Sequence, residues 1–221
     1  MDHDDYANMQ LLIDNTFNKQ FPALNISERR AVCPSMTEWC EERKKLGFKN
    51  LVKDKSSDKC SKISYTLPVH KEKIIRVVSS PVTHIGNLCN TIDFLVPEGT
   101  EVYAAADGIV TALKDDSNIG GFDPKYWYEG NYIVIKHNGE STEYEHFRHK
   151  GTIVKLGDIV KQGQLIDYSG NTGYSRGPHL HFEVMEFYGP GDEDYVKLKA
   201  KFKDFQDVYE TIAKQRAFRT I

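Results

Sequence analysis

The chain has 221 residues, enough for one domain of ordinary size with appendages or for two small domains. Its hydrophobic fraction of 39% and its aromatic fraction of 11% suffice for a packed core and exclude wholesale disorder. The formal net charge of −3 is close to neutral, so no strongly basic field indicates a nucleic-acid partner. No apolar run has the length of a membrane-spanning helix, and the start of the chain, with Asp2 and His3, lacks the pattern of a signal peptide.

The first part of the chain is predicted to be helical. Over residues 1–60, apolar side chains recur at near-helical spacing, beginning between residues 9 and 17. Ser35 and Glu38 form a capping-box pattern for a second helix. Residues 50–62 are rich in lysine and serine, which is typical of a linker. We therefore expect a helical N-terminal extension over residues 1–62.

From residue 63 the sequence changes to short β-rich runs separated by turn residues. The Asn138-Gly139 pair between two alternating runs predicts a β-hairpin. Residues 115–130 are too many for a tight turn and are expected to form a surface loop. Many short strands without intervening helices predict a mainly β, antiparallel domain over residues 63–191. The expected strands are residues 74–78, 91–95, 101–104, 108–114, 132–137, 141–146, 164–168 and 181–186.

The last part of the chain, residues 192–221, is predicted to be a helical tail. Its apolar side chains are spaced as if along one helical face. They are Val196, Leu198, Phe202, Phe205, Val208, Tyr209 and Ile212.

The four cysteines, Cys33, Cys40, Cys60 and Cys89, form no C-x-x-C pair, which argues against a four-thiolate zinc site. A disulfide from Cys33 to Cys40 or Cys60 would cross-link the N-terminal segment. Reduced, partly buried thiols are the other interpretation, and both stay open.

The most informative local pattern is the H-x-H pair of His179 and His181. Residues i and i+2 of a strand point to the same face, so the two imidazoles project side by side. Such a pair can share a metal ion or divide metal binding and proton transfer between its members. Two solvent-facing histidines on a strand are the ordinary alternative.

Two further positions are candidates because of their surroundings. Asp93 lies within an apolar run, where a carboxylate is costly unless it is paired or bound to a cation. His146 ends an expected strand in a Tyr-x-His pattern that begins at Tyr144. We interpret His137 and His149 as ordinary polar histidines.

Five segments, in this order, resemble the lysostaphin/LytM-type zinc metallopeptidases, which cut peptide crosslinks in bacterial cell walls. The segments are Thr-Ile-Asp-Phe-Leu-Val-Pro-Glu-Gly-Thr with the ten residues that follow (91–110), Tyr-Glu-His (144–146), Gly-Asp-Ile-Val-Lys-Gln-Gly-Gln (157–164), Ser-Gly-Asn-Thr-Gly (169–173) and Gly-Pro-His-Leu-His-Phe-Glu-Val (177–184). The resemblance covers residues 74–187 and does not extend to residues 1–60 or 192–221. It implies a barrel-like LytM-type β core.

The resemblance also implies a role for each histidine of the patterns. In this family one zinc ion is bound by an early histidine, an aspartate and the second histidine of H-x-H. Asp93 and His181 match the last two positions. The first histidine of H-x-H and the histidine of Tyr-x-His are catalytic, which assigns these roles to His179 and His146.

The early histidine is where this sequence departs from the common pattern. Cys89 stands four residues before the aspartate, where the family's histidine is usual. His84 matches a less common arrangement with a short insertion between the two ligands. We expect His84 to be the third ligand, because imidazole and carboxylate ligands suit a catalytic zinc, and Cys89 stays the alternative.

The resemblance implies a zinc endopeptidase that cleaves peptidoglycan or other glycine- or alanine-containing peptide crosslinks. It also implies a secreted, periplasmic or cell-surface location. Two other functions stay open. A non-catalytic member of the same fold could bind cell wall or activate another hydrolase, and the aromatic residues within 122–128 would also suit a carbohydrate-binding β module.

Overall fold

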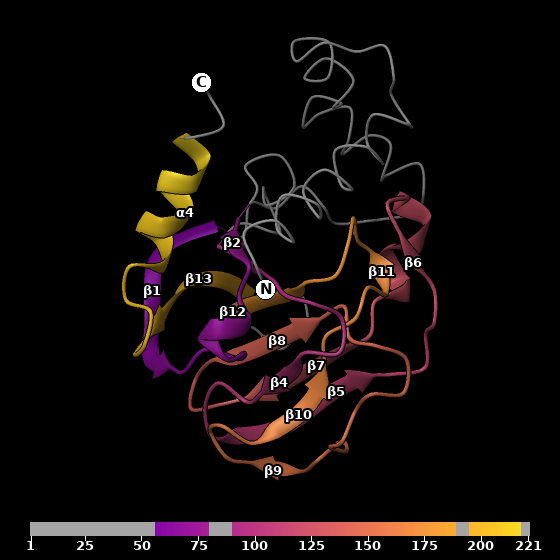
Figure 1. The fold of residues 1–221 in the computed structure, drawn as a ribbon. Helices are drawn as coiled ribbons and strands as arrows, with labels where there is room; N and C mark the ends of the chain where they lie inside the picture. Colours follow the sequence, from indigo (N-terminus) through magenta and orange to yellow (C-terminus); the bar gives the residue numbers. More distant parts are fainter. Residues whose placement is uncertain (1–55, 80–89, 189–194, 218–221) are drawn as a thin grey trace. The chain divides into compact units, whose positions relative to one another are not determined.

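The structure is a computed structural model, and it describes residues 56–79, 90–188 and 195–217. Most of these residues lie in strands (Figure 1). The strands are β1 (Ser56–Tyr65), β2 (Arg76–Val78), β3 (Ile92–Leu95), β4 (Glu101–Tyr103), β5 (Gly108–Lys114), β6 (Gly120–Gly121), β7 (Tyr132–Lys136), β8 (Ser141–Glu145), β9 (Ile159–Val160), β10 (Leu165–Tyr168), β11 (Gly173–Tyr174), β12 (Leu180–Phe187) and β13 (Tyr195–Phe202). The helices are the 3-10 turns η1 (Lys71–Lys73) and η3 (Pro124–Glu129) and the α-helix α4 (Val208–Ala217). The mainly β fold is confirmed.

The main sheet has the strand order β1-β13-β12-β8-β7-β5-β9, and β3 joins it by pairing with β12 and with β2. In Figure 1, β8, β7 and β5 lie side by side, as their antiparallel registers require. The pairings within the sheet are antiparallel except that β1 and β13 run parallel. Strand β12 is central, because β8 borders one side while β3 and β13 share the other.

Strand alternation gives the main sheet two chemically different faces. Ile133, Ile135, Tyr144 and Phe182 point to one face and are fully buried in the hydrophobic core. That core also contains side chains of β4 and β10, which pair with each other in a separate two-stranded sheet. The Tyr144 hydroxyl accepts a hydrogen bond of 2.9 Å from the Ala105 backbone N–H, just after β4. Residues of the opposite parity, such as 143, 145, 181 and 183, therefore lie on the other face.

The expected hairpin is present. Gly139 has a φ of 81°, in the left-handed region that glycine adopts readily, and the His137 backbone N–H donates to the Glu140 carbonyl over 2.8 Å. All eight expected strands are found with limits within about two residues, the usual disagreement at element ends. The expected loop 115–130 contains β6 and η3.

The helical predictions at both ends need correction. Strand β1 includes residues 56–62. This segment was expected to belong to the helical N-terminal region, over residues 1–60, and to the linker, over residues 50–62. Residues 195–202 form strand β13, and among the described residues of the predicted C-terminal tail only α4 at 208–217 is an α-helix. In β13 the apolar positions 196, 198, 200 and 202 alternate with lysines 197, 199 and 201, a period of two that indicates a strand. The remaining predictions for residues 1–55 lie outside the described residues.

The limits of the predicted regions, 1–62, 63–191 and 192–221, stay a prediction. The described residues all belong to one compact unit, residues 55–221. Strand β1 crosses the limit at 62, strand β13 lies beyond the limit at 191, and the two pair with each other in the main sheet of this unit. Cys60 is exposed and its thiol is free, whereas Cys33, Cys40 and Cys89 lie outside the described residues. None of the described helices is long and apolar enough to cross a membrane.

Candidate active site

The centre of the candidate site is the first half of β12. In the pairing registers His181 lies opposite Asp93 of β3 on one side and opposite Glu145 of β8 on the other. This strand is buried along most of its length, so the polar side chains on its outer face need partners.

Asp93 and His181 are in direct contact. His181 Nδ1 donates a hydrogen bond of 2.9 Å to Asp93 Oδ1, and the other ring nitrogen, Nε2, lies 3.4 Å from Glu183 Oε2. Burial disfavours the charged imidazole, but the hydrogen bonds with Asp93 and Glu183 outweigh burial and raise the pKa of His181 to about 10. The aspartate expected to bind a cation therefore lies beside the histidine expected to share it.

His179 is held by the backbone just before β12. Its Nδ1 donates to the Gly177 carbonyl over 2.8 Å and lies 3.2 Å from the Ser175 hydroxyl. A carbonyl oxygen accepts but cannot donate, so this contact assigns the ring hydrogen to Nδ1. Burial, and next the neighbouring His146, lower the pKa of His179 to about 4, so the ring is neutral at pH 7. Its Nε2, 3.8 Å from Asp93 Oδ1, then carries the lone pair.

His146 lies directly after β8 and has a left-handed backbone, with a φ of 71°. Alternation along β8 would otherwise place residue 146 on the core face with Tyr144, so the left-handed turn ends this alternation and lets the imidazole face His179. This conformation costs about 1–2 kcal/mol for a residue with a Cβ and is concentrated at functional sites. His146 Nδ1 donates to the Thr172 carbonyl over 2.7 Å, which leaves the lone pair of a neutral ring on Nε2.

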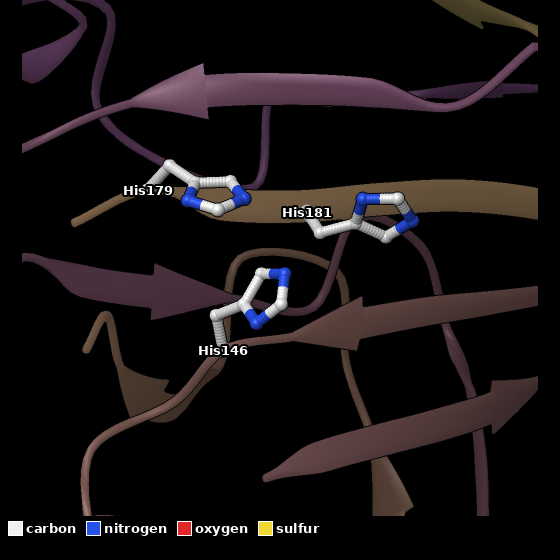
Figure 2. Close-up of side chains that lie close together, drawn as sticks. All are labelled: His146, His179 and His181. Carbon is white, nitrogen blue, oxygen red and sulfur yellow. The ribbon is translucent and has the colours of Figure 1, made fainter. Parts of the chain in front are cut away.

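The three histidines converge. Figure 2 shows His181 on β12, His179 just before this strand begins, and the His146 ring directed toward them. The ring centroid of His146 is 4.4 Å from that of His179 and 5.9 Å from that of His181. One nitrogen from each of the three lies within 4.8 Å of the others, the only group of this kind found in the described part of the chain. Together with the Asp93 carboxylate these are ligand atoms that zinc prefers, so the residues present fit a zinc ion.

The structure thus brings together four of the five predicted site residues. They are Asp93, His146, His179 and His181. The geometry does not by itself separate metal ligands from proton-transfer groups, so the individual roles stay predictions. His84 and Cys89 lie outside the described residues, and the choice between them stays a prediction too.

His137 and His149 do not belong to the cluster. His137 is buried between the Asp107 carbonyl and the Thr142 hydroxyl, at 2.7 and 2.9 Å, and His149 is exposed. Their interpretation as ordinary polar histidines agrees with these positions.

Sequence reasoning missed the residues that hold the histidines in place. Glu183 contacts His181, and it could have been found because it lies two residues further along the same face of the strand. Lys197, which binds Glu183, comes from a distant segment and carried no local signal. Thr172 lies in the segment 169–173 of the resemblance, but nothing in that segment indicated that its carbonyl accepts from His146.

Known proteins resemble the part of the chain that contains this site. Peptidase family M23 matches residues 88–196. An uncharacterized metalloprotease of Buchnera aphidicola is 41% identical over 106 residues, which are 48% of this chain and 25% of the relative. The peptidoglycan DD-endopeptidase ShyB of Vibrio cholerae is 41% identical over 104 residues, which are 47% of this chain and 22% of the relative.

Among solved structures, a zinc-containing peptidase from Vibrio cholerae is 32% identical, with a TM-score of 0.45 over 62% of this chain and 40% of that one. The chain spans about a quarter of the length of the curated relatives it matches, or less. The matched region contains Asp93 and the three clustered histidines. Residues 88–196 of this chain belong to peptidase family M23.

Proposed function

We propose that this chain is a zinc endopeptidase that hydrolyses peptide crosslinks of peptidoglycan. The observation that carries the proposal is the convergence of His146, His179 and His181 beside the Asp93 carboxylate, within a peptidase M23 domain. The name of the relative ShyB, a peptidoglycan DD-endopeptidase, supports the choice of substrate. Crosslinks that contain glycine or alanine are the substrates we expect. A peptidoglycan substrate also favours a secreted, periplasmic or cell-surface location.

In this proposal Asp93 and His181 bind the zinc ion, and His84 is the third ligand. Zinc supplies Lewis acidity, which makes a water molecule more acidic and polarises the carbonyl of the scissile peptide bond. Three protein ligands leave one position open for this chemistry.

His146 and His179 carry out the proton transfers. Both donate through Nδ1 to backbone carbonyls, so each presents an Nε2 lone pair when neutral. A neutral Nε2 can accept a proton from water, and a protonated one can stabilise the oxyanion or donate to the leaving amine. The fixed rings provide the orientation that general acid–base catalysis needs.

The proposal is tested with purified protein and cross-linked peptidoglycan, by following zinc content and the release of new amino groups. The wild type should carry about one zinc per chain and release amino groups, and a chelator should stop this until zinc is restored. Asp93→Ala and His181→Ala should lose both zinc and activity. The exposed His149 supplies a matched control, and His149→Ala should behave as the wild type.

Two results would overturn the proposal. Full zinc occupancy in Asp93→Ala and His181→Ala would show that these residues are not the ligands. A zinc-loaded wild type that binds peptidoglycan but releases no amino groups would instead identify a non-catalytic module.

A further inference from the structure

The ring of His181 is held between two carboxylates. Its Nδ1 faces Asp93 at 2.9 Å, and its Nε2 faces Glu183 at 3.4 Å. Because His181 and Glu183 are two residues apart on β12, they lie on the same face of the sheet. The side of the ring that points away from Asp93 is therefore fixed by a carboxylate of the same strand.

Glu183 is in turn held by a lysine from the C-terminal part of the chain. The Lys197 ammonium donates a hydrogen bond to Glu183 Oε2, and only 3% and 4% of these two side chains are exposed. Lys197 lies opposite Met185 in the β12–β13 register, and its carbonyl accepts a hydrogen bond of 3.0 Å from Asn90 Nδ2. Its backbone is thus fixed by the sheet and by a side chain that lies close to β3.

The surroundings of Glu183 show why it needs a cation. In the β8–β12 register Glu143 lies opposite Glu183, and Glu145 lies opposite His181. The neighbours on β8 are therefore carboxyl groups, which supply no positive charge to offset that of the Glu183 carboxylate. A buried carboxylate without a cation costs several kcal/mol, by order of magnitude, and would turn toward water or become neutral. The Lys197 ammonium, from the opposite side, offsets this charge.

We propose that Lys197 positions His181 for metal binding by holding the Glu183 carboxylate against the outer ring nitrogen. The inference rests on the proposed function, in which His181 is a metal ligand. A carboxylate bound to the distal nitrogen of a ligating histidine fixes the orientation of the ring and makes it a better ligand, and losing it typically costs about 10–100-fold in metal affinity. Lys197 lies one residue beyond the M23 match at 88–196, so this positioning residue comes from outside the matched region.

The test measures the zinc dissociation constant by competition with a chromophoric chelator, together with thermal unfolding of the zinc-free protein. Lys197→Met should weaken zinc binding by about 10–100-fold. Lys197→Arg keeps the charge and should restore most of the affinity. Lys201 lies on the same strand with an exposed side chain, so Lys201→Met is the matched control and should bind zinc as the wild type does.

Lys197→Met leaves a buried carboxylate unpaired and could fail to fold, so Glu183→Gln and the double variant Glu183→Gln/Lys197→Met complete the experiment. The double variant has no unpaired buried charge and should remain folded. Because Lys197 acts through Glu183, Lys197→Met should add no further loss of affinity in the Glu183→Gln background.

Three outcomes would overturn the inference. Wild-type affinity in the folded double variant would show that the pair does not orient His181. Additive losses from the two substitutions would show that Lys197 acts independently of Glu183. After either of these two results the proposed function still stands, because the wild type binds zinc. The third outcome, a wild type that binds no zinc, would overturn both this inference and the proposed function.

Discussion

Alanine at Gly173 tests whether the segment that follows Thr172 positions His146. Gly173 has a φ of +79°, a left-handed conformation that costs a residue with a Cβ about 1–2 kcal/mol. An added Cβ would lie 2.7 Å from backbone atoms of Gly130 and 3.4 Å from His146 Nδ1. Because carbon atoms in contact are about 3.5–4.0 Å apart, the backbone at 130 or 173 must move by roughly 1 Å. Such a movement shifts the Thr172 carbonyl that accepts from His146.

Gly163 provides a matched control, because its φ is also +79° but an added Cβ there meets nothing within 4 Å. Both Gly163→Ala and Gly173→Ala should lose about 1–2 kcal/mol of stability from the backbone conformation alone. Only Gly173→Ala adds a displacement beside His146, the side chain proposed to transfer protons. A misplacement of about 1 Å near reacting groups can cost about 10²-fold in rate, so we expect a loss of kcat/KM of this order.

The assay combines urea unfolding, zinc content and kcat/KM on a soluble cross-linked peptidoglycan fragment. Gly173→Ala should keep its zinc and lose activity, while Gly163→Ala should keep both and lose only stability. Equal activities in two folded variants would refute the reasoning that this segment positions His146.

Three further predictions concern other residues. His146→Ala and His179→Ala should keep their zinc and lose activity by about 10²-fold or more, and loss of zinc from either variant would contradict its assignment to proton transfer. Asp167 is fully buried, and burial raises its pKa from 3.8 to about 6, so its contribution to stability is largest below pH 3.8 and is lost as the pH rises through 6. As Asp167 ionises, the wild type should lose about 3 kcal/mol of its free energy of unfolding, and Asp167→Asn should not show this loss. If the difference in unfolding free energy between the two proteins is the same at pH 4 and pH 8 in urea unfolding, the prediction is wrong. His84→Ala should abolish zinc binding and Cys89→Ser should leave it intact. Loss of zinc from Cys89→Ser alone, with a sulfur shell at about 2.3 Å in X-ray absorption, would identify Cys89 as the ligand.

Much of the fold could be predicted because alternation and turn chemistry are local. The Asn138-Gly139 hairpin and the strands on either side follow from residues that are neighbours in the sequence. The period of two predicted that His179 and His181 project to one side, and both lie in the cluster with His146. Asp93 drew attention because it interrupts an apolar run, and it lies beside His181.

The errors have physical causes as well. In β13 the lysines between the apolar residues indicated a strand, but the longer apolar pattern that continues into α4 was interpreted as a single helix. The sequence of β1 is polar, with few apolar residues to show its period, and the strand is specified by its pairing with β13. Tertiary pairing decides such segments against their local preference.

The candidate site shows the same division between local and long-range information. The residue types of the cluster were visible in the sequence. The left-handed backbone of His146 was not visible, and neither was the contact of its ring with the carbonyl of Thr172, which lies 26 residues further along the chain. Nor was the contact of Lys197 with Glu183, since it joins β12 to β13, and residues 195–202 were expected to be helical.

The most direct test of the central claim is mass spectrometry of a purified cross-linked muropeptide dimer after incubation with the zinc-loaded protein. The account predicts two monomers whose summed mass exceeds that of the dimer by one water, with none formed by His181→Ala. An intact dimer in the presence of zinc-loaded wild type, or equal cleavage by His181→Ala, would contradict the account.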